Sequence, residues 1–158
     1  MHVEVTRSPR RHKTVQARLV DGVLRIAIPD AFSEAEERHW VTTMETRFQN
    51  RRDADLIDLS ARAGVLAERH GLPLPASIEW SGRQRTLWGS CTIGTERIRI
   101  SRRAAAFPTW VLDYIIVHEL AHLDVPKHDK AFWRLVHRYH LAERARGYLI
   151  AKAEDSPA

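Results

Sequence analysis

The sequence predicts an α+β fold in which a small, largely antiparallel sheet packs against a buried helix. Short segments of alternating apolar and polar residues occur on both sides of residue 75, and turn residues bound each of them. Helical periodicity dominates the rest of the chain, and one helical segment, residues 109–124, is apolar over most of its length. A chain of 158 residues is most simply one domain, so we expect a single domain over residues 1–158.

The N-terminal segment has the pattern of a β-hairpin. Apolar and polar residues alternate over residues 15–19, and the alternation resumes from Val23 to Ile28. The intervening Asp21-Gly22 is typical of a tight turn between two paired strands. A short strand at Val3–Thr6 is expected to precede the hairpin.

Two helices are expected between the hairpin and residue 71. Ser33 and Glu36 form a capping box, which predicts that the first helix begins there. Its apolar positions follow a helical period: Trp40, Val41, Met44 and Phe48. The second helix is predicted from Ala54 to His70, with Gly71 as its C′ residue. Two prolines in the segment 72–75 then interrupt the chain, so residues 1–75 and 76–158 are expected to form two parts of the domain.

The second part combines short strands with helices. Strands are predicted at Ser77–Ser81, Thr86–Thr92 and Arg97–Ser101, with a turn at Ile93–Glu96. These strands are too close together to need helical crossovers, which favours antiparallel pairing. Pro108 is suited to the first helical position and opens a helix from Thr109 to about Asp124. Further helices are predicted around residues 128–139 and 142–152.

Composition limits the compartment and the partners. Cys91 is the only cysteine, so no intramolecular disulfide can form and a reducing compartment is expected. Residues 1–5 lack the apolar stretch of a signal peptide, and no segment approaches the ~20 apolar residues of a membrane span. These features predict a cytoplasmic protein with no membrane partner. The net charge of +5 could serve a nucleotide or nucleic acid partner, or the arginines could be scattered and solvated.

The residues that carry the chemistry are His118-Glu119-Leu120-Ala121-His122. Residues four apart lie on one helix face, roughly 5–6 Å apart at Cβ, so the two imidazoles can converge on one ion. Glu119 points to an adjacent sector, from which it can reach a water molecule beside the ion. Two histidines and a third ligand would leave the fourth tetrahedral position open, as in catalytic zinc sites. The pattern therefore predicts one Zn²⁺ per chain, although other divalent transition metals suit the same ligands.

His128 is the expected third ligand. On a continuous helix it would lie about 9 Å beyond His122 along the axis and on the wrong side. Pro126 disfavours the α conformation at Val125, so the helix should end near Asp124 and the chain can turn back. Asp124 is the rival ligand, but it lies only two residues from His122 and faces away.

The chain is similar to the YgjP-like metallopeptidases, which are related to the WLM and SprT-type zinc peptidases of the zincin superfamily. The residues that carry the resemblance are Trp88-Gly89-Ser90-Cys91, Tyr114, Val117–Leu123, His128 and Phe132-Trp133. The resemblance implies a zincin-like domain, in which residues 76–158 form the metal-binding core. It also implies that His118, His122 and His128 are zinc ligands and that Glu119 is the general base. One departure is Leu87, which occupies the place of an arginine usual in the family.

Further residues are candidates for substrate binding. The strand containing Trp88, Gly89 and Ser90 could pair with an extended peptide, and Gly89 would permit its close approach. Arg83 or Arg85 could take the place of the arginine that is usual in the family, and Tyr114 could polarise a substrate oxygen. The alternative is that Trp88, Tyr114 and Cys91 only fill the core.

The function predicted from these features is that of a zinc-dependent hydrolase, most simply a metallopeptidase acting on a polypeptide. One alternative is a nucleoside triphosphate pyrophosphohydrolase on the same metal site, in which Arg83 and Arg85 hold phosphates. Another is a DNA-associated metal-binding module. Glu119 argues against this last alternative, because a purely structural metal site has no need of a base.

Overall fold

The computed structural model describes residues 1–154, which divide into two compact units. The first unit is Met1–Arg52 and the second begins at Asp53. The boundary falls within helix α1, Glu34–Asp55, and not at residues 72–75, where two prolines interrupt the sequence. The organisation of the whole chain as one domain stays a prediction.

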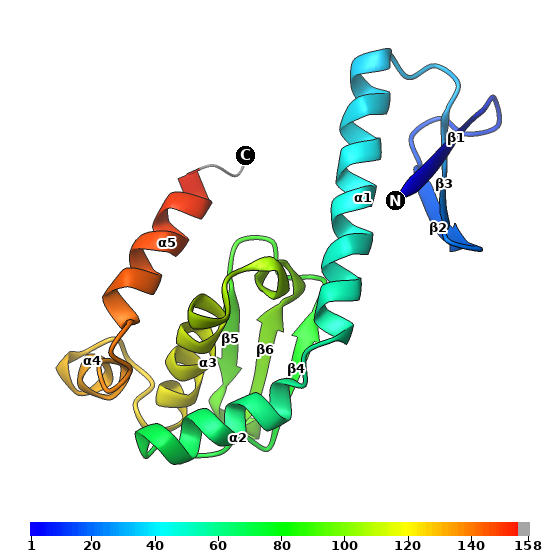
Figure 1. Cartoon of the computed structure of the whole chain (residues 1–158). Coiled ribbons are helices and arrows are strands. Elements are labelled where there is room, and N and C mark those ends of the chain that lie inside the picture. Colours follow the sequence, from blue (N-terminus) through cyan, green and yellow to red (C-terminus); the bar gives the residue numbers. More distant parts are fainter. Residues whose placement is uncertain (155–158) are drawn as a thin grey trace. The chain divides into compact units, whose positions relative to one another are not determined.

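The first unit contains a three-stranded sheet (Figure 1). Its strands are β1, His2–Ser8, β2, Gln16–Val20, and β3, Val23–Pro29, and β3 lies in the middle. The predicted turn between β2 and β3 is confirmed, because Asp21 and Gly22 have φ angles of 51° and 79°.

Helix α1 packs its apolar residues on this sheet. The capping box is formed as predicted: the Ser33 amide donates to Oε2 of Glu36 at 2.7 Å, and the Glu36 amide donates to Oγ of Ser33 at 3.2 Å. Leu24, Ile26 and Ile28 of β3 form a core with the apolar face of α1. Residues of α1 in this core are Trp40, Val41, Met44 and Phe48.

The second unit begins with the end of α1 and with helix α2, Leu59–His70. The prediction that this helix starts at Ala54 was wrong. Helix α1 continues to Asp55, and Asp58 then caps α2 by accepting a hydrogen bond from the Ala61 amide at 3.0 Å. Gly71 ends α2 in the left-handed conformation, as expected.

The sheet of the second unit has the order β4-β6-β5. Its strands are β4, Ser77–Ser81, β5, Gly89–Thr92, and β6, Arg97–Ser101. β5 and β6 form an antiparallel hairpin, whereas β4 joins the other edge of β6 in parallel. β1 joins β3 in the same way, so both sheets are mixed and not largely antiparallel as expected. A parallel pair needs no helical crossover here, because the intervening strand reverses the chain on the far side of the central strand.

Three helices complete the second unit: α3, Thr109–Asp124, α4, Lys130–Val136, and α5, Ala142–Glu154. Short 3-10 helices occupy Ile93–Thr95 and Arg102–Ala106. The segment predicted as one helix over residues 128–139 is helical only in α4. Within the described residues, none of the helices has the length and apolarity required to cross a membrane.

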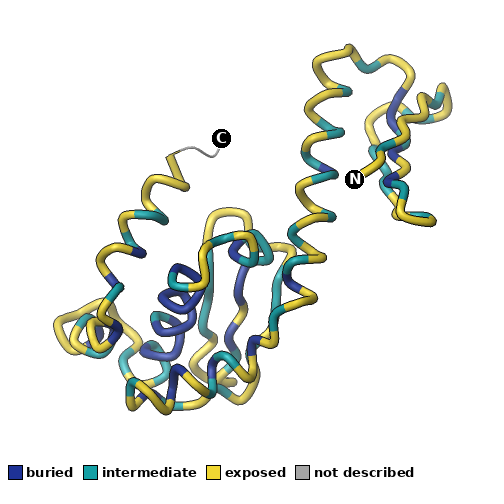
Figure 2. Tube along the Cα trace, in the orientation of Figure 1, coloured by how far each residue is buried: buried dark blue, intermediate teal, exposed yellow. Residues whose placement is uncertain are grey.

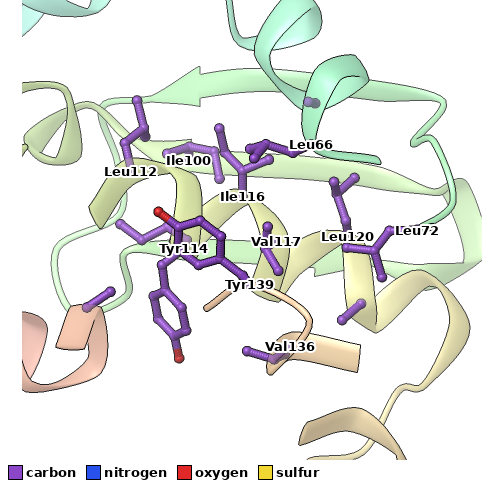
Figure 3. Close-up of a cluster of buried hydrophobic side chains, with 14 of the residues drawn as sticks. Leu66, Leu72, Ile100, Leu112, Tyr114, Ile116, Val117, Leu120, Val136 and Tyr139 are labelled. Carbon is purple, nitrogen blue, oxygen red and sulfur yellow. The ribbon is translucent and has the colours of Figure 1, made fainter. Parts of the chain in front are cut away.

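Helix α3 is the centre of the larger core. It is drawn as buried over most of its length in Figure 2. Figure 3 shows Ile116, Val117 and Leu120 of α3 near Leu66 of α2 and Val136 of α4. Ile98 and Ile100 of β6 belong to the same core, so α2 and α3 cover one face of the sheet. A helix buried on nearly all sides holds its few polar side chains in fixed positions.

Candidate metal centre

The helix that carries the histidine pair ends where the sequence predicts. Val125 has extended backbone angles, φ −130° and ψ 98°, immediately before Pro126. The chain then turns, and Asp129 begins α4 by accepting a hydrogen bond from the Phe132 amide at 3.0 Å. This turn returns His128 to the histidine face of α3.

His118, His122 and His128 form one cluster. One ligand atom of each lies within 4.8 Å of the others. The Nε2 atoms of His118 and His128 are 3.2 Å apart. Among the described residues, the metal-capable cluster does not include Asp124, which is exposed at the end of α3. The geometry therefore favours His128 over Asp124 as the third candidate ligand.

The cluster fits a tetrahedral metal ion. Two nitrogens bound at about 2.05 Å to a tetrahedral zinc would lie about 3.3 Å apart. The observed 3.2 Å between Nε2 of His118 and Nε2 of His128 matches this spacing. A metal ligand must also be an unprotonated imidazole. Burial, reinforced by the neighbouring His122 and His128, lowers the pKa of His118 to about 3, so this ring is neutral at physiological pH.

Hydrogen bonds at the outer nitrogens orient two of the three rings. Nδ1 of His122 lies 3.2 Å from the carbonyl oxygen of Val125, so Nδ1 carries the proton and Nε2 is available as a ligand. Nδ1 of His118 lies 3.4 Å from the hydroxyl of Tyr114, one turn earlier on the same face. Burial raises the pKa of Tyr114 to about 12, so its hydroxyl stays protonated. Tyr114 thus contacts the outer side of a candidate ligand.

Two aromatic residues of α4 form a wall beside the histidines. Phe132 is fully buried and stacks on His122 with ring centroids 4.4 Å apart. Trp133 stacks on His128 at 5.9 Å. Because His128 itself is exposed, these contacts and the capped start of α4 are what position its ring.

Glu119 lies between α3 and strand β5. Its side chain is 6 % exposed, and burial raises the pKa of its carboxyl to about 8. A Cβ atom added to Gly89 would lie 2.7 Å from Oε1 of Glu119, closer than any ordinary contact. Position 89 therefore needs glycine for the approach of a side chain of the enzyme itself, whereas the sequence suggested the approach of a substrate.

The other residues predicted to bind substrate do not all lie beside the histidine cluster. Trp88 packs edge-on against Phe107 at 4.9 Å and lies under the Arg103 guanidinium at 4.2 Å, so it anchors the start of β5. Ser90 belongs to the sheet face away from α3, because Gly89 and Cys91 pair with the buried residues of β6. Arg85 and Leu87 are exposed in the segment before β5.

Cys91 is half-buried on the inner face of the sheet. Burial, with a smaller effect of Glu119, raises the pKa of its thiol. The thiol therefore stays protonated at neutral pH, which suits a small packing residue better than a metal ligand or nucleophile.

Arg146 of α5 is a residue near the cluster that the sequence does not reveal. Its guanidinium lies 4.4 Å from the Trp133 ring and donates to Glu143 at 3.0 Å. Its charge is also one of the smaller causes that lower the pKa of His118. No spacing signal links Arg146 to the histidines, because only the packing of α5 against α3 brings it there.

Comparison with known proteins identifies the fold and the family. Residues 37–146 match the metallopeptidase domain of the YgjP-like family. The structure resembles the crystal structure of the metallopeptidase zymogen abylysin of Pyrococcus abyssi, with a TM-score of 0.54 and 17 % sequence identity. The match covers 62 % of this chain and 97 % of abylysin, and the low identity makes it a similarity of fold. No curated protein matches the chain. The match over residues 37–146 shows that the chain belongs to the YgjP-like metallopeptidase family, whose activity is metal-dependent hydrolysis.

Proposed function

We propose that the protein is a zinc peptidase in which His118, His122 and His128 hold the metal and Glu119 is the general base. The observation that carries the proposal is the pairing of a cluster of three imidazoles, two of them on α3, with a buried carboxylic acid on the same helix. A structural zinc site has four protein ligands, whereas this cluster has three. When bound, the metal supplies a Lewis acid that lowers the pKa of water at its open position to about 7.

Glu119 is suited to move the proton. A carboxyl group whose pKa lies near neutrality both accepts and returns a proton readily at physiological pH. Its carboxylate would take the proton of the attacking water and later pass it to the leaving amine. Gly89 supports this role by letting the carboxylate lie against β5 without a side chain in the way.

The edge of the sheet supports a polypeptide as the substrate. β5 is an edge strand in the order β4-β6-β5, and its inner face contains the residue that touches Glu119. An extended polypeptide could add to this edge through main-chain hydrogen bonds, which would bring its backbone carbonyl beside the histidine cluster. Recognition of this kind needs an unfolded segment more than a particular side chain.

The experiment compares the zinc-loaded enzyme with Glu119→Gln on an unfolded peptide library and on the common nucleoside triphosphates. Glu119→Gln should keep its zinc and its fold while hydrolysis falls roughly 10²–10⁴-fold. Peptide cleavage that depends on Glu119 would support the proposal. Release of phosphate or pyrophosphate that depends on Glu119, without peptide cleavage, would overturn the substrate class.

The ligand set is tested separately. Elemental analysis of purified His128→Ala should show loss of tightly bound zinc, whereas Asp124→Ala should keep it. Full zinc occupancy in His128→Ala would show that the third ligand is another residue.

A further inference from the structure

A hollow of the larger unit lies along β4 and β6 and the segment that follows β4, on the face of the sheet away from α3. Its volume is about 510 Å³, within the usual size range of small-molecule sites. Side chains of Glu79 and Arg99 line it, and these point away from the core because Ile98 and Ile100 point into it. The arginines that line the hollow are Arg83, Arg97, Arg99 and Arg102.

The charge of this hollow is strongly unbalanced. Glu79 is the only acidic residue in its lining, and two arginines already share it. Arg97 forms an ion pair with Oε1 of Glu79, and Nε of Arg99 lies 3.5 Å from the same oxygen. Within residues 1–154, the side chains of Arg83 and Arg102 make no hydrogen bond or ion pair. Two guanidinium groups therefore face the hollow without an anion.

Unsatisfied buried atoms also gather here. Three buried side-chain atoms in the described part of the chain lack a hydrogen-bond partner, and two of them, Nε of Arg102 and Oε1 of Gln84, belong to residues lining this hollow. A buried polar atom without a partner costs about 1–3 kcal/mol. A ligand that supplied partners for both atoms would remove that cost.

The segment around the hollow is held in place. Nε2 of the Gln84 side chain donates to Oγ of Ser90 at 2.7 Å, which fixes the orientation of that side chain. The Arg83 backbone amide donates to Oγ of Ser81 at 3.3 Å. A Cβ on Gly82 would lie 3.2 Å from Nη1 of Arg102, so the guanidinium lies close against the backbone. These contacts hold the backbone of the segment and place the Arg102 guanidinium against it before any ligand binds.

We propose that this hollow is a binding site for the phosphate group of a small phosphate ester. Guanidinium groups bind phosphate oxygens through paired N–H donors. Two unpaired guanidiniums call for a dianion, which a phosphate monoester provides at neutral pH and a single carboxylate does not. The volume exceeds the needs of one phosphate, which leaves room for the esterified molecule.

The site is separate from the histidine cluster. Gly89 and Cys91 of β5 face α3, whereas the hollow is on the opposite face of the same sheet. The proposal therefore does not depend on the hydrolytic function. The nucleotide hypothesis requires Arg83 to hold phosphates beside the metal. The position of Arg83 at a hollow on the opposite face of the sheet argues against that role.

The test is calorimetric titration of the full-length zinc-loaded protein with inorganic phosphate and with glycerol 3-phosphate, at constant ionic strength. Saturable binding should weaken at least tenfold in Arg102→Gln and in Arg83→Gln. Arg69→Gln is the matched control, because Arg69 is an exposed arginine of α2 outside the hollow, and it should bind within twofold of wild type. Tighter binding of glycerol 3-phosphate would identify an ester as the ligand; equal binding of both probes would assign the site to free phosphate.

Phosphate can also bind zinc, so His128→Ala is titrated in parallel. Binding that is lost in His128→Ala but kept in Arg102→Gln would overturn the proposal. Absence of saturable binding up to about 10 mM of either probe would overturn it as well. Arg83 is exposed, so Arg83→Gln should fold normally. If Arg102→Gln does not fold, the phosphate affinity of Arg83→Gln decides whether the proposal holds.

Discussion

Replacing Gly89 by alanine would put a methyl group where the Glu119 carboxylate now lies. The added Cβ would be 2.7 Å from Oε1 and 2.9 Å from Cγ of Glu119, whereas ordinary van der Waals contact begins at 3.4 Å. The carboxylate must therefore move by about 0.7 Å, because the strand backbone cannot yield without breaking its pairing with β6. A misplacement of about 1 Å at a reacting group can cost 10²-fold in rate, so we expect a loss of roughly 10- to 100-fold.

The assay measures kcat/KM on a quenched fluorescent peptide that the wild type cleaves, together with zinc content. Gly89→Ala should keep its zinc, because the three atoms nearest to the added Cβ all belong to Glu119 and none to a histidine. Gly94→Ala is the matched control, since a Cβ there meets nothing within 4 Å, and it should retain full activity. If Gly89→Ala keeps more than half of the wild-type activity with normal zinc content, the carboxylate does not act from its observed position.

Four further outcomes are expected. At pH 7 the metal-free Glu119 carboxyl, with a pKa of about 8, is mostly protonated. Zinc binding should therefore release about one proton in wild type that Glu119→Gln does not release. Calorimetry in buffers of different ionisation enthalpy measures this difference. The raised pKa also means that Glu119 makes a contribution to the stability of the metal-free protein that is lost as the pH rises from 4.5 to 8, and in urea titrations Glu119→Gln should lack this contribution relative to wild type. Phe132→Ala should lower the free energy of unfolding by about 3–5 kcal/mol and weaken zinc binding, because the ring is fully buried and stacks on His122. Asp113→Ala should lower the free energy of unfolding by about 2 kcal/mol, because it removes both carboxylate oxygens that accept hydrogen bonds from the Arg62 guanidinium, at 2.6 and 2.5 Å. An unchanged urea midpoint would show that this ion pair contributes nothing to stability.

Features fixed by neighbouring residues were the ones that could be predicted. The turn at Asp21-Gly22, the cap at Ser33 and the end of α3 before Pro126 each depend on backbone preferences of a few residues. The spacing of His118 and His122 on one helix face is equally local. Such signals act within a few residues and survive any tertiary arrangement.

Features that depend on packing between distant segments could not be predicted. The parallel pairing of β4 with β6 depends on which edge of the hairpin remains free, and alternation of residues does not report it. Helix α1 extends to Asp55, whereas the sequence predicted that the next helix starts at Ala54, because tertiary packing overrides local helix preferences there. Arg146 reaches the histidine cluster only because α5 packs on α3, and Gly89 meets Glu119 only because β5 lies beside the same helix.

The origin of the three imidazoles has a consequence for motion. Two belong to α3, and the third precedes α4 on a segment of five residues between the helices. An ion held by all three would join the two helices, so α4 could open locally only after the metal dissociates. The amide protons of α4 should then exchange with solvent more slowly as free zinc increases, in proportion to the ratio of zinc concentration to its dissociation constant. The exchange rates of the α4 amide protons would thus report the concentration of free zinc around the protein.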